Sequence, residues 1–145
     1  MLTYSALRFL PVFPWLTRIA LNDTVLPVGG GPDGKASVFV PKGSLFETSF
    51  YVLHRNTDIW GPTAGVFNPD RWDSHKPGAW EYLPFSGGLR ACPGRGKALT
   101  EASFVVARLV GEFESMVQVD HEEWTGKVQL VAKNAGGCKV GFVRK

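Results

Sequence analysis

The chain has 145 residues, which is enough for one domain. Its net charge is +3, from 16 lysine and arginine residues against 13 acidic ones. The sequence contains no run of like charge, which argues against a dedicated nucleic-acid or membrane-surface protein. The 44% hydrophobic content excludes disorder, and two cysteines are too few for a disulfide scaffold and favour a reducing compartment.

The first residues predict a short helix, because Leu2, Ala6 and Phe9 share one helical face. No residue ahead of this helix is suited to cap it, and Pro11 and Pro14 end it.

Three strand patterns follow in the first third of the chain. Two short strands are predicted at Thr24–Val28 and Ser37–Val40, joined by a glycine-rich turn. After a second turn at Pro41–Gly43, the pattern over Leu45–Leu53 predicts a strand that runs into a short helix.

The segment from Asn56 to Ser86 shows no period and is rich in tryptophan, proline and glycine. An irregular segment of this length is uncommon inside a domain and is often functional. Its aromatic residues are expected to form a small core of their own.

The last part of the chain holds the clearest amphipathic pattern. Apolar residues at spacings of three and four predict a helix over Ala98–Phe113. Three strands are predicted to follow near Met116–Val119, Val128–Val131 and Val140–Val143, with a turn at Asn134–Gly137.

Between these regions, Phe85–Glu101 reads FSGGLRACPGRGKALTE and places Cys92 one turn ahead of the long helix. A helix N-terminus and nearby cations favour a thiolate, and glycines permit a tight loop with backbone N–H groups turned toward a buried sulfur. The alternative is an ordinary buried thiol. The cations and glycines are Arg90, Arg95, Lys97, Gly87, Gly88, Gly94 and Gly96.

Other chemistries fail on spacing. A phosphate-binding loop would need glycine and serine or threonine where Ala91 and Ala98 stand, and a dinucleotide motif starting at Gly94 ends on Leu99. A cysteine phosphatase would need arginine at Ala98, and no Gly-x-Ser-x-Gly is present. Zinc lacks paired ligand spacing, so the histidines are expected to be surface or capping groups. They are His54, His75 and His121.

The segment Phe85–Gly94 resembles the F-x-x-G-x-R-x-C-x-G haem loop of the cytochrome P450 family. Phe67–Trp72 resembles the family's meander motif, and His54–Pro62 the segment before it. Leu7–Arg8, followed by two prolines, resembles the end of the helix that carries E-x-x-R. The stretch 23–35 is most similar to fungal alkane and fatty-acid hydroxylases, and the resemblance covers essentially the whole chain.

This resemblance implies that Cys92 is the proximal thiolate ligand of haem iron, a ligand that favours O–O cleavage. Phe85 is expected to pack beside the sulfur and limit its contact with solvent. Gly88 and Gly94 are expected to let the backbone approach the sulfur and the porphyrin.

Arginines carry the remaining expectations. The resemblance implies that Arg90 pairs with a haem propionate and that Arg18 binds the second one. One departure stands at Ser5, where the family has the glutamate of E-x-x-R, so Arg8 and Arg71 would lack their carboxylate.

The resemblance implies a fold that is α+β by content, the C-terminal haem-binding portion of the mostly helical cytochrome P450 fold. Residues 1–145 are expected to be a single partial domain without the N-terminal part. In the family, that part carries the membrane anchor, most helices, the oxygen-activating threonine and most of the substrate pocket.

The implied function is the haem-binding part of a monooxygenase that inserts one oxygen atom into a C–H bond of an apolar substrate. Electrons would come from NADPH through a reductase. Complete relatives are expected at the endoplasmic reticulum membrane. This chain shows neither a signal peptide nor the ~18 apolar residues that span a bilayer, which leaves the cytosol or an undefined location.

Two other hypotheses remain open. The chain is a truncated fragment or gene-model remnant without activity, as a start inside a helix and Ser5 both suggest. Alternatively, it is a redox protein that uses Cys92 as a reactive thiol, for which no resolving cysteine lies nearby in sequence.

Overall fold

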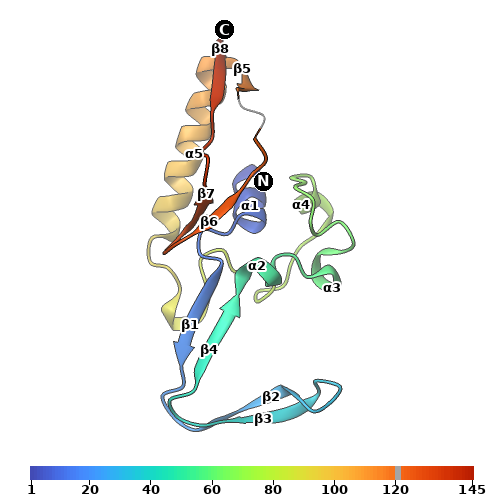
Figure 1. The fold of residues 1–145 in the computed structure, drawn as a ribbon. Coiled ribbons are helices and arrows are strands. Elements are labelled where there is room, and N and C mark those ends of the chain that lie inside the picture. Colours follow the sequence, from blue (N-terminus) through green and yellow to red (C-terminus); the bar gives the residue numbers. More distant parts are fainter. Residues whose placement is uncertain (120–121) are drawn as a thin grey trace. The chain divides into compact units, whose positions relative to one another are not determined.

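The computed structural model describes residues 1–119 and 122–145, which divide into two compact units. One unit is Trp15–Ser49, and the other combines Met1–Pro14 with Phe50–Lys145. The chain contains both helices and small two-stranded sheets (Figure 1), so the prediction of mixed α and β content is confirmed.

The smaller unit consists of two antiparallel strand pairs. Strand β1 (Trp15–Ile19) pairs with β4 (Leu45–Ser49), and β2 (Thr24–Gly30) pairs with β3 (Ala36–Val40). The predicted strands in this region are confirmed. Strand β1 was not predicted, because its five residues follow Pro14 and show no alternation of apolar and polar side chains.

The larger unit begins with helix α1 (Leu2–Phe9), which has no side-chain cap at its N-terminus, as the sequence predicts. Three helices of one turn each, α2 (Phe50–Leu53), α3 (Thr57–Trp60) and α4 (Arg71–Ser74), come from the segment around the meander motif. Asn56 caps α3, since its side chain accepts a hydrogen bond from the backbone N–H of Asp58 at 2.9 Å.

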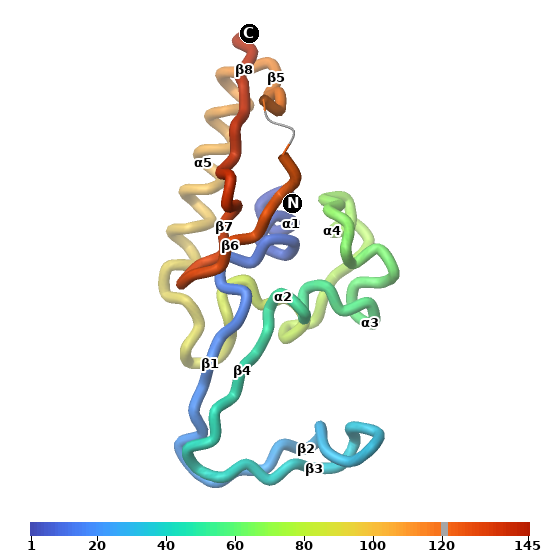
Figure 2. The backbone as a smooth tube through the Cα atoms, viewed as in Figure 1, coloured from blue at the N-terminus to red at the C-terminus, as the bar shows by residue number. Residues whose placement is uncertain are grey.

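Helix α5 (Arg95–Glu112) begins three residues earlier than predicted and ends before Phe113. Gly96 fits in its first turn because that turn needs few intrahelical hydrogen bonds. Strand β5 (Phe113–Gln118) then pairs with β8 (Val140–Arg144). The part of the chain that connects these two strands includes a short hairpin of β6 (Gly126–Val128) and β7 (Ala132–Asn134), as the tube in Figure 2 shows.

One predicted strand is wrong in part. Residues 129–131 form the turn of the hairpin, where the N–H of Gln129 donates to the carbonyl of Val131 at 3.2 Å, and β7 was not predicted. The apolar run over 128–131 therefore marks a tight hairpin, and a run of four apolar residues does not distinguish the two.

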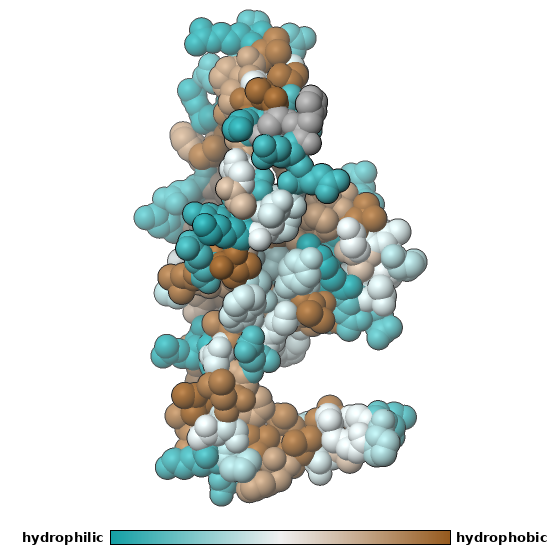
Figure 3. All heavy atoms as spheres, viewed as in Figure 1, coloured by the Kyte–Doolittle hydropathy of each residue, from teal (hydrophilic) through white to brown (hydrophobic). Residues whose placement is uncertain are grey.

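The core of the larger unit is small and comes from residues 50–64, just before the meander motif. Phe50, Trp60 and Ala64 are the buried apolar side chains described in this unit, whereas many large apolar residues are exposed. Hydrophobic spheres accordingly reach the surface in several places in Figure 3. Among the residues that the structure describes, no helix is both long enough and apolar enough to cross a membrane.

Candidate haem-binding site

The cysteine loop is closed on itself by backbone hydrogen bonds. The N–H of Cys92 donates to the carbonyl of Phe85 at 2.9 Å, and the N–H of Ala91 donates to Gly88 at 3.1 Å. The 3-10 turn η1 (Gly88–Arg90) lies between them. The loop therefore holds Cys92 two residues ahead of Gly94, the N-cap of α5, which is the predicted place for the cysteine.

Cys92 is a free thiol whose side chain is exposed. The expectation of a buried sulfur surrounded by backbone donors is wrong for this structure, since no described residue donates a hydrogen bond to Sγ. The physical reason is that no described residue packs over this side of the loop. The side chain of Leu89 in the same loop is fully exposed, and α5 contains no buried residue.

Two glycines of the loop have distinct physical roles. A Cβ at Gly94 would lie 3.7 Å from the Sγ of Cys92, so Gly94 is next to the sulfur. Gly88 has φ +71, a conformation that glycine adopts without strain, and open space surrounds it. Glycine therefore allows the backbone to turn here, and no described atom lies within 4 Å of where a Cβ would be.

The remaining predicted residues lie in different settings. Phe85 is half-buried in the loop, and Arg90 is exposed with no hydrogen bond or ion pair among the described residues. Arg18 is exposed on β1, where its Nη1 donates to the carbonyl of Thr17 at 3.0 Å. The structure thus brings five of the six together in one loop, while Arg18 belongs to the other compact unit.

A cavity of about 430 Å³ lies beside the cysteine loop. Aromatic side chains of Tyr4, Trp80 and Tyr82 form much of its wall, and Arg95 supplies a cation. Trp80 also explains why Gly87 is a glycine, since a Cβ there would lie only 2.8 Å from the indole ring.

Helix α1 contributes a fully buried arginine that has no carboxylate partner in the part of the chain that the structure describes. Arg8 donates from Nη1 to the carbonyls of His54 at 2.5 Å and Ala64 at 2.9 Å, and from Nη2 to Val66 at 3.1 Å. Burial, with the charges of Arg71 and Arg55, lowers the pKa of Arg8 to about 10, so it stays charged at neutral pH. Backbone carbonyls therefore replace the expected carboxylate.

Ser5 is buried at the position of the missing glutamate, and its Oγ accepts a hydrogen bond from the indole Nε1 of Trp72 at 2.7 Å. Arg71 donates instead to the carbonyls of Trp60 at 2.8 Å and Thr63 at 2.7 Å, which leaves its Nε buried without a partner among the described residues. Among the described residues neither arginine has a carboxylate partner, which agrees with the expectation.

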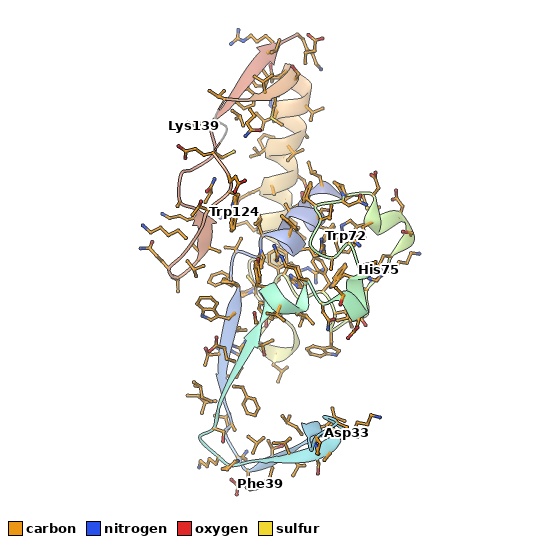
Figure 4. The ribbon with its side chains drawn as sticks, turned by 45° about the vertical axis from the view of Figure 1, so that its right-hand side comes forward. Asp33, Phe39, Trp72, His75, Trp124 and Lys139 are labelled. Atoms are coloured by element: carbon orange, nitrogen blue, oxygen red, sulfur yellow. The ribbon has the colours of Figure 1, made fainter. Side chains whose placement is uncertain are left out.

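Around these groups lies an aromatic cluster, which we define as Tyr4, Trp60, Trp72, His75 and Tyr82. Trp72 touches Tyr82 with ring centroids 4.9 Å apart, and Trp60 lies 5.7 Å from Trp72. Trp72 and His75 are labelled in Figure 4. The predicted core of the irregular segment is confirmed, although Trp80 remains 67% exposed.

His54 is wrongly predicted as a surface or capping residue. Its side chain is fully buried, and its Nε2 accepts a hydrogen bond from the backbone N–H of Leu83 at 2.9 Å. Burial and the neighbouring charge of Arg8 lower the pKa of His54 to about 4. Its spacing of four from Phe50 predicts that it lies on the same side of the chain as that buried ring, and this signal is present in the sequence. His121 lies outside the described residues.

Comparison with known proteins agrees with this geometry. A family model described as cytochrome P450 matches residues 6–139. A cytochrome P450 monooxygenase of a Fusarium species is 47% identical over 136 residues, which covers 93% of this chain and 24% of the relative. A cytochrome P450 monooxygenase of Aspergillus japonicus is 44% identical over 136 residues, covering 94% and 24%. Cytochrome P450 52E1 of Candida apicola is 42% identical over 150 residues, covering 97% and 29%.

These matches extend over nearly all of the chain, and the chain belongs to the cytochrome P450 family. The predicted membership is confirmed, and the relatives from Fusarium and Aspergillus japonicus are named as monooxygenases. Family members hold haem iron through a cysteine thiolate. The chain spans about a quarter of the length of these relatives.

Proposed function

We propose that this chain is the haem-ligating part of a cytochrome P450 monooxygenase, with Cys92 as the axial thiolate. The observation that carries the proposal is the exposed thiol of Cys92, held by a closed loop directly ahead of the N-terminus of α5. The positive end of an 18-residue helix favours a thiolate at this place.

The residues present fit haem on one side. The sulfur is accessible, Gly94 beside it leaves room for close approach, and the free guanidinium of Arg90 suits a carboxylate of propionate type. Phe85 flanks the loop and would limit solvent contact of the sulfur, while Gly88 presents unobstructed backbone. Arg18 remains a candidate for a second propionate.

When bound, haem iron with an axial thiolate supplies the oxygen activation that inserts one oxygen atom into a C–H bond of an apolar substrate. The role of this chain is to hold the sulfur and orient the group. Residues 1–145 would form the C-terminal portion of one larger domain, attached in the complete protein to the endoplasmic reticulum membrane.

Electrons would come from NADPH through a reductase. Arg95 and Lys97 lie at the start of α5 next to the cysteine loop, where positive charge suits an acidic partner surface. Lys97 is exposed and pairs with Glu101 at 3.6 Å, a weak interaction that leaves it free to exchange partners.

Titration of the chain with haem, followed by the Soret band, tests this proposal. We expect Cys92→Ser to weaken binding about 100-fold or more and Arg90→Gln about tenfold, because one change removes a metal ligand and the other a charge-assisted hydrogen bond. Cys138→Ser is the matched control, since Cys138 is also an exposed free thiol, and it should bind as the unchanged chain does.

Equal haem binding by Cys92→Ser and the unchanged chain would contradict the proposal. If neither binds haem and Cys92 is alkylated much faster than Cys138, a reactive-thiol function takes its place. If neither binds haem and both thiols react alike, the chain is an inactive fragment.

A further inference from the structure

The fully buried imidazole of His54 is not used by the proposed haem ligation, yet it is bonded to the segment that leads into the cysteine loop. The hydrogen bond from the N–H of Leu83 to His54 Nε2 joins residues 29 positions apart. A buried acceptor in this position fixes the place of the segment that donates, because leaving either group unpaired is costly.

From Leu83, hydrogen bonds continue to the cysteine. The N–H of Ser86 donates to the carbonyl of Leu83 at 3.2 Å, which closes a turn around Phe85, and the carbonyl of Phe85 accepts the N–H of Cys92 at 2.9 Å. Ser86 has φ 61, a left-handed conformation that is unfavourable for serine and persists only where its surroundings hold it.

Both the backbone and the ring of His54 are held by neighbouring residues. Arg8 donates to the backbone carbonyl of His54 at 2.5 Å. The ring stacks on Phe50 with an interplanar angle of 15° and lies 5.2 Å from the ring of Tyr82. The chain of contacts therefore runs from helix α1 through His54 to the loop that carries Cys92.

We propose that His54 is a positioning residue for Cys92: through Leu83 and the turn closed by Ser86 it fixes the carbonyl of Phe85 that holds the cysteine backbone. That Cys92 ligates haem rests on the proposed function, whereas the positioning of its backbone does not.

This role requires a neutral ring with the proton on Nδ1, because Nε2 must accept. Nδ1 is buried without a hydrogen-bond partner among the described residues, so the ring gains nothing from the alternative tautomer. Arg8 and Arg55 add positive charge nearby and oppose protonation. A glutamine side chain offers an acceptor oxygen at a similar reach, whereas phenylalanine fills the space without one.

The test compares His54→Phe with His54→Gln by amide hydrogen exchange of the isotope-labelled chain. We expect His54→Phe to raise the exchange rates of both the Leu83 and the Cys92 amides about tenfold, equivalent to about 1.4 kcal/mol. His54→Gln should keep both rates within about threefold of the original, because the acceptor remains. His75→Phe is the matched control, since His75 belongs to the aromatic cluster that His54 contacts through Tyr82 and does not bond to Leu83.

Should His54→Phe fail to fold, Leu83→Pro removes the same hydrogen bond from the donor side and is expected to raise Cys92 exchange alike. The haem-loaded chain gives a second readout, a shift of the reduced carbon-monoxide band from thiolate type toward thiol type in His54→Phe and its recovery in His54→Gln.

Unchanged exchange at Cys92, despite faster exchange at Leu83, would overturn the proposal and limit His54 to its own turn. Equal loss in the glutamine and phenylalanine variants would overturn it too. If the unchanged chain shows no thiolate band, the proposed function fails, while the exchange rates still decide the role of His54.

Discussion

Around Arg8, several side chains of the larger unit are buried and the guanidinium donates to backbone carbonyls, whereas along α5 no side chain is buried. In the region around Arg8, the aromatic side chains pack together into a small core. Helix α5 exposes apolar side chains such as Phe104 and Val110, at 64% and 65%.

This contrast shows where the stability of the unit resides. The aromatic cluster and the contacts of Arg8 are complete within the chain, although the glutamate typical of the family is absent. The cysteine loop has backbone hydrogen bonds, but no described residue packs over Cys92. The hydrogen bond from Leu83 to His54, whose ring contacts Tyr82, connects the segment before the loop to the cluster. The position of the proposed haem ligand therefore depends on a buried core, although none of the residues proposed to bind haem belongs to that core.

The largest effect is expected at Arg8. Replacing it with leucine leaves three carbonyl groups without their buried donor, and the free energy of unfolding should fall by about 3–5 kcal/mol. Urea unfolding followed by tryptophan fluorescence measures this change. Arg144→Leu, at an exposed arginine of β8, should alter stability by less than about 0.5 kcal/mol. Similar losses in the two variants would remove the distinction between the regions.

Acid should weaken the cluster through His54. Its pKa is about 4 in the folded chain against 6.5 for a free histidine, so the unfolded state binds the proton first as pH falls. Stability present above pH 6.5 should decline between pH 6.5 and 4 by about 3 kcal/mol, then stay level with respect to this group. The difference between the unfolding curves of the unchanged chain and His54→Gln isolates the effect. A difference independent of pH would show that His54 titrates normally.

A smaller effect is expected where Ser5 stands in place of the glutamate. Ser5→Ala and Trp72→Phe each remove the hydrogen bond between the hydroxyl and the indole, and their combination should show a coupling of about 1 kcal/mol. Denaturant unfolding of both single variants and the double variant gives this coupling. Strict additivity would mean that the hydroxyl of Ser5 and the indole of Trp72 do not interact in solution.

The smallest effects are expected on α5. Val110→Ala and Phe104→Ala remove exposed side chains and favour the helix slightly, so stability should change by less than about 0.5 kcal/mol in either direction. Thermal unfolding followed by circular dichroism measures this. A loss of several kcal/mol would show that these side chains are packed in solution and that the two regions do not differ.

The sequence predicted the elements whose cause is local. Helix α1, the strands near Thr24 and Val140, and the place of Cys92 ahead of a long helix follow from periodicity and turn residues. It did not predict that Arg8 would be satisfied by carbonyls of residues 46 to 58 positions away, since those contacts depend on the path of the irregular segment. The exposure of Cys92 is likewise set by which surfaces find a partner, and a linear pattern does not record that.

The identity of the iron ligand is the central claim, and the reduced, carbon-monoxide-bound difference spectrum of the haem-loaded chain tests it most directly. The unchanged chain and Cys138→Ser should both give the red-shifted Soret band of an axial thiolate, and Cys92→Ser should lose it. A thiolate band that persists in Cys92→Ser, or that disappears in Cys138→Ser, would contradict the assignment of Cys92.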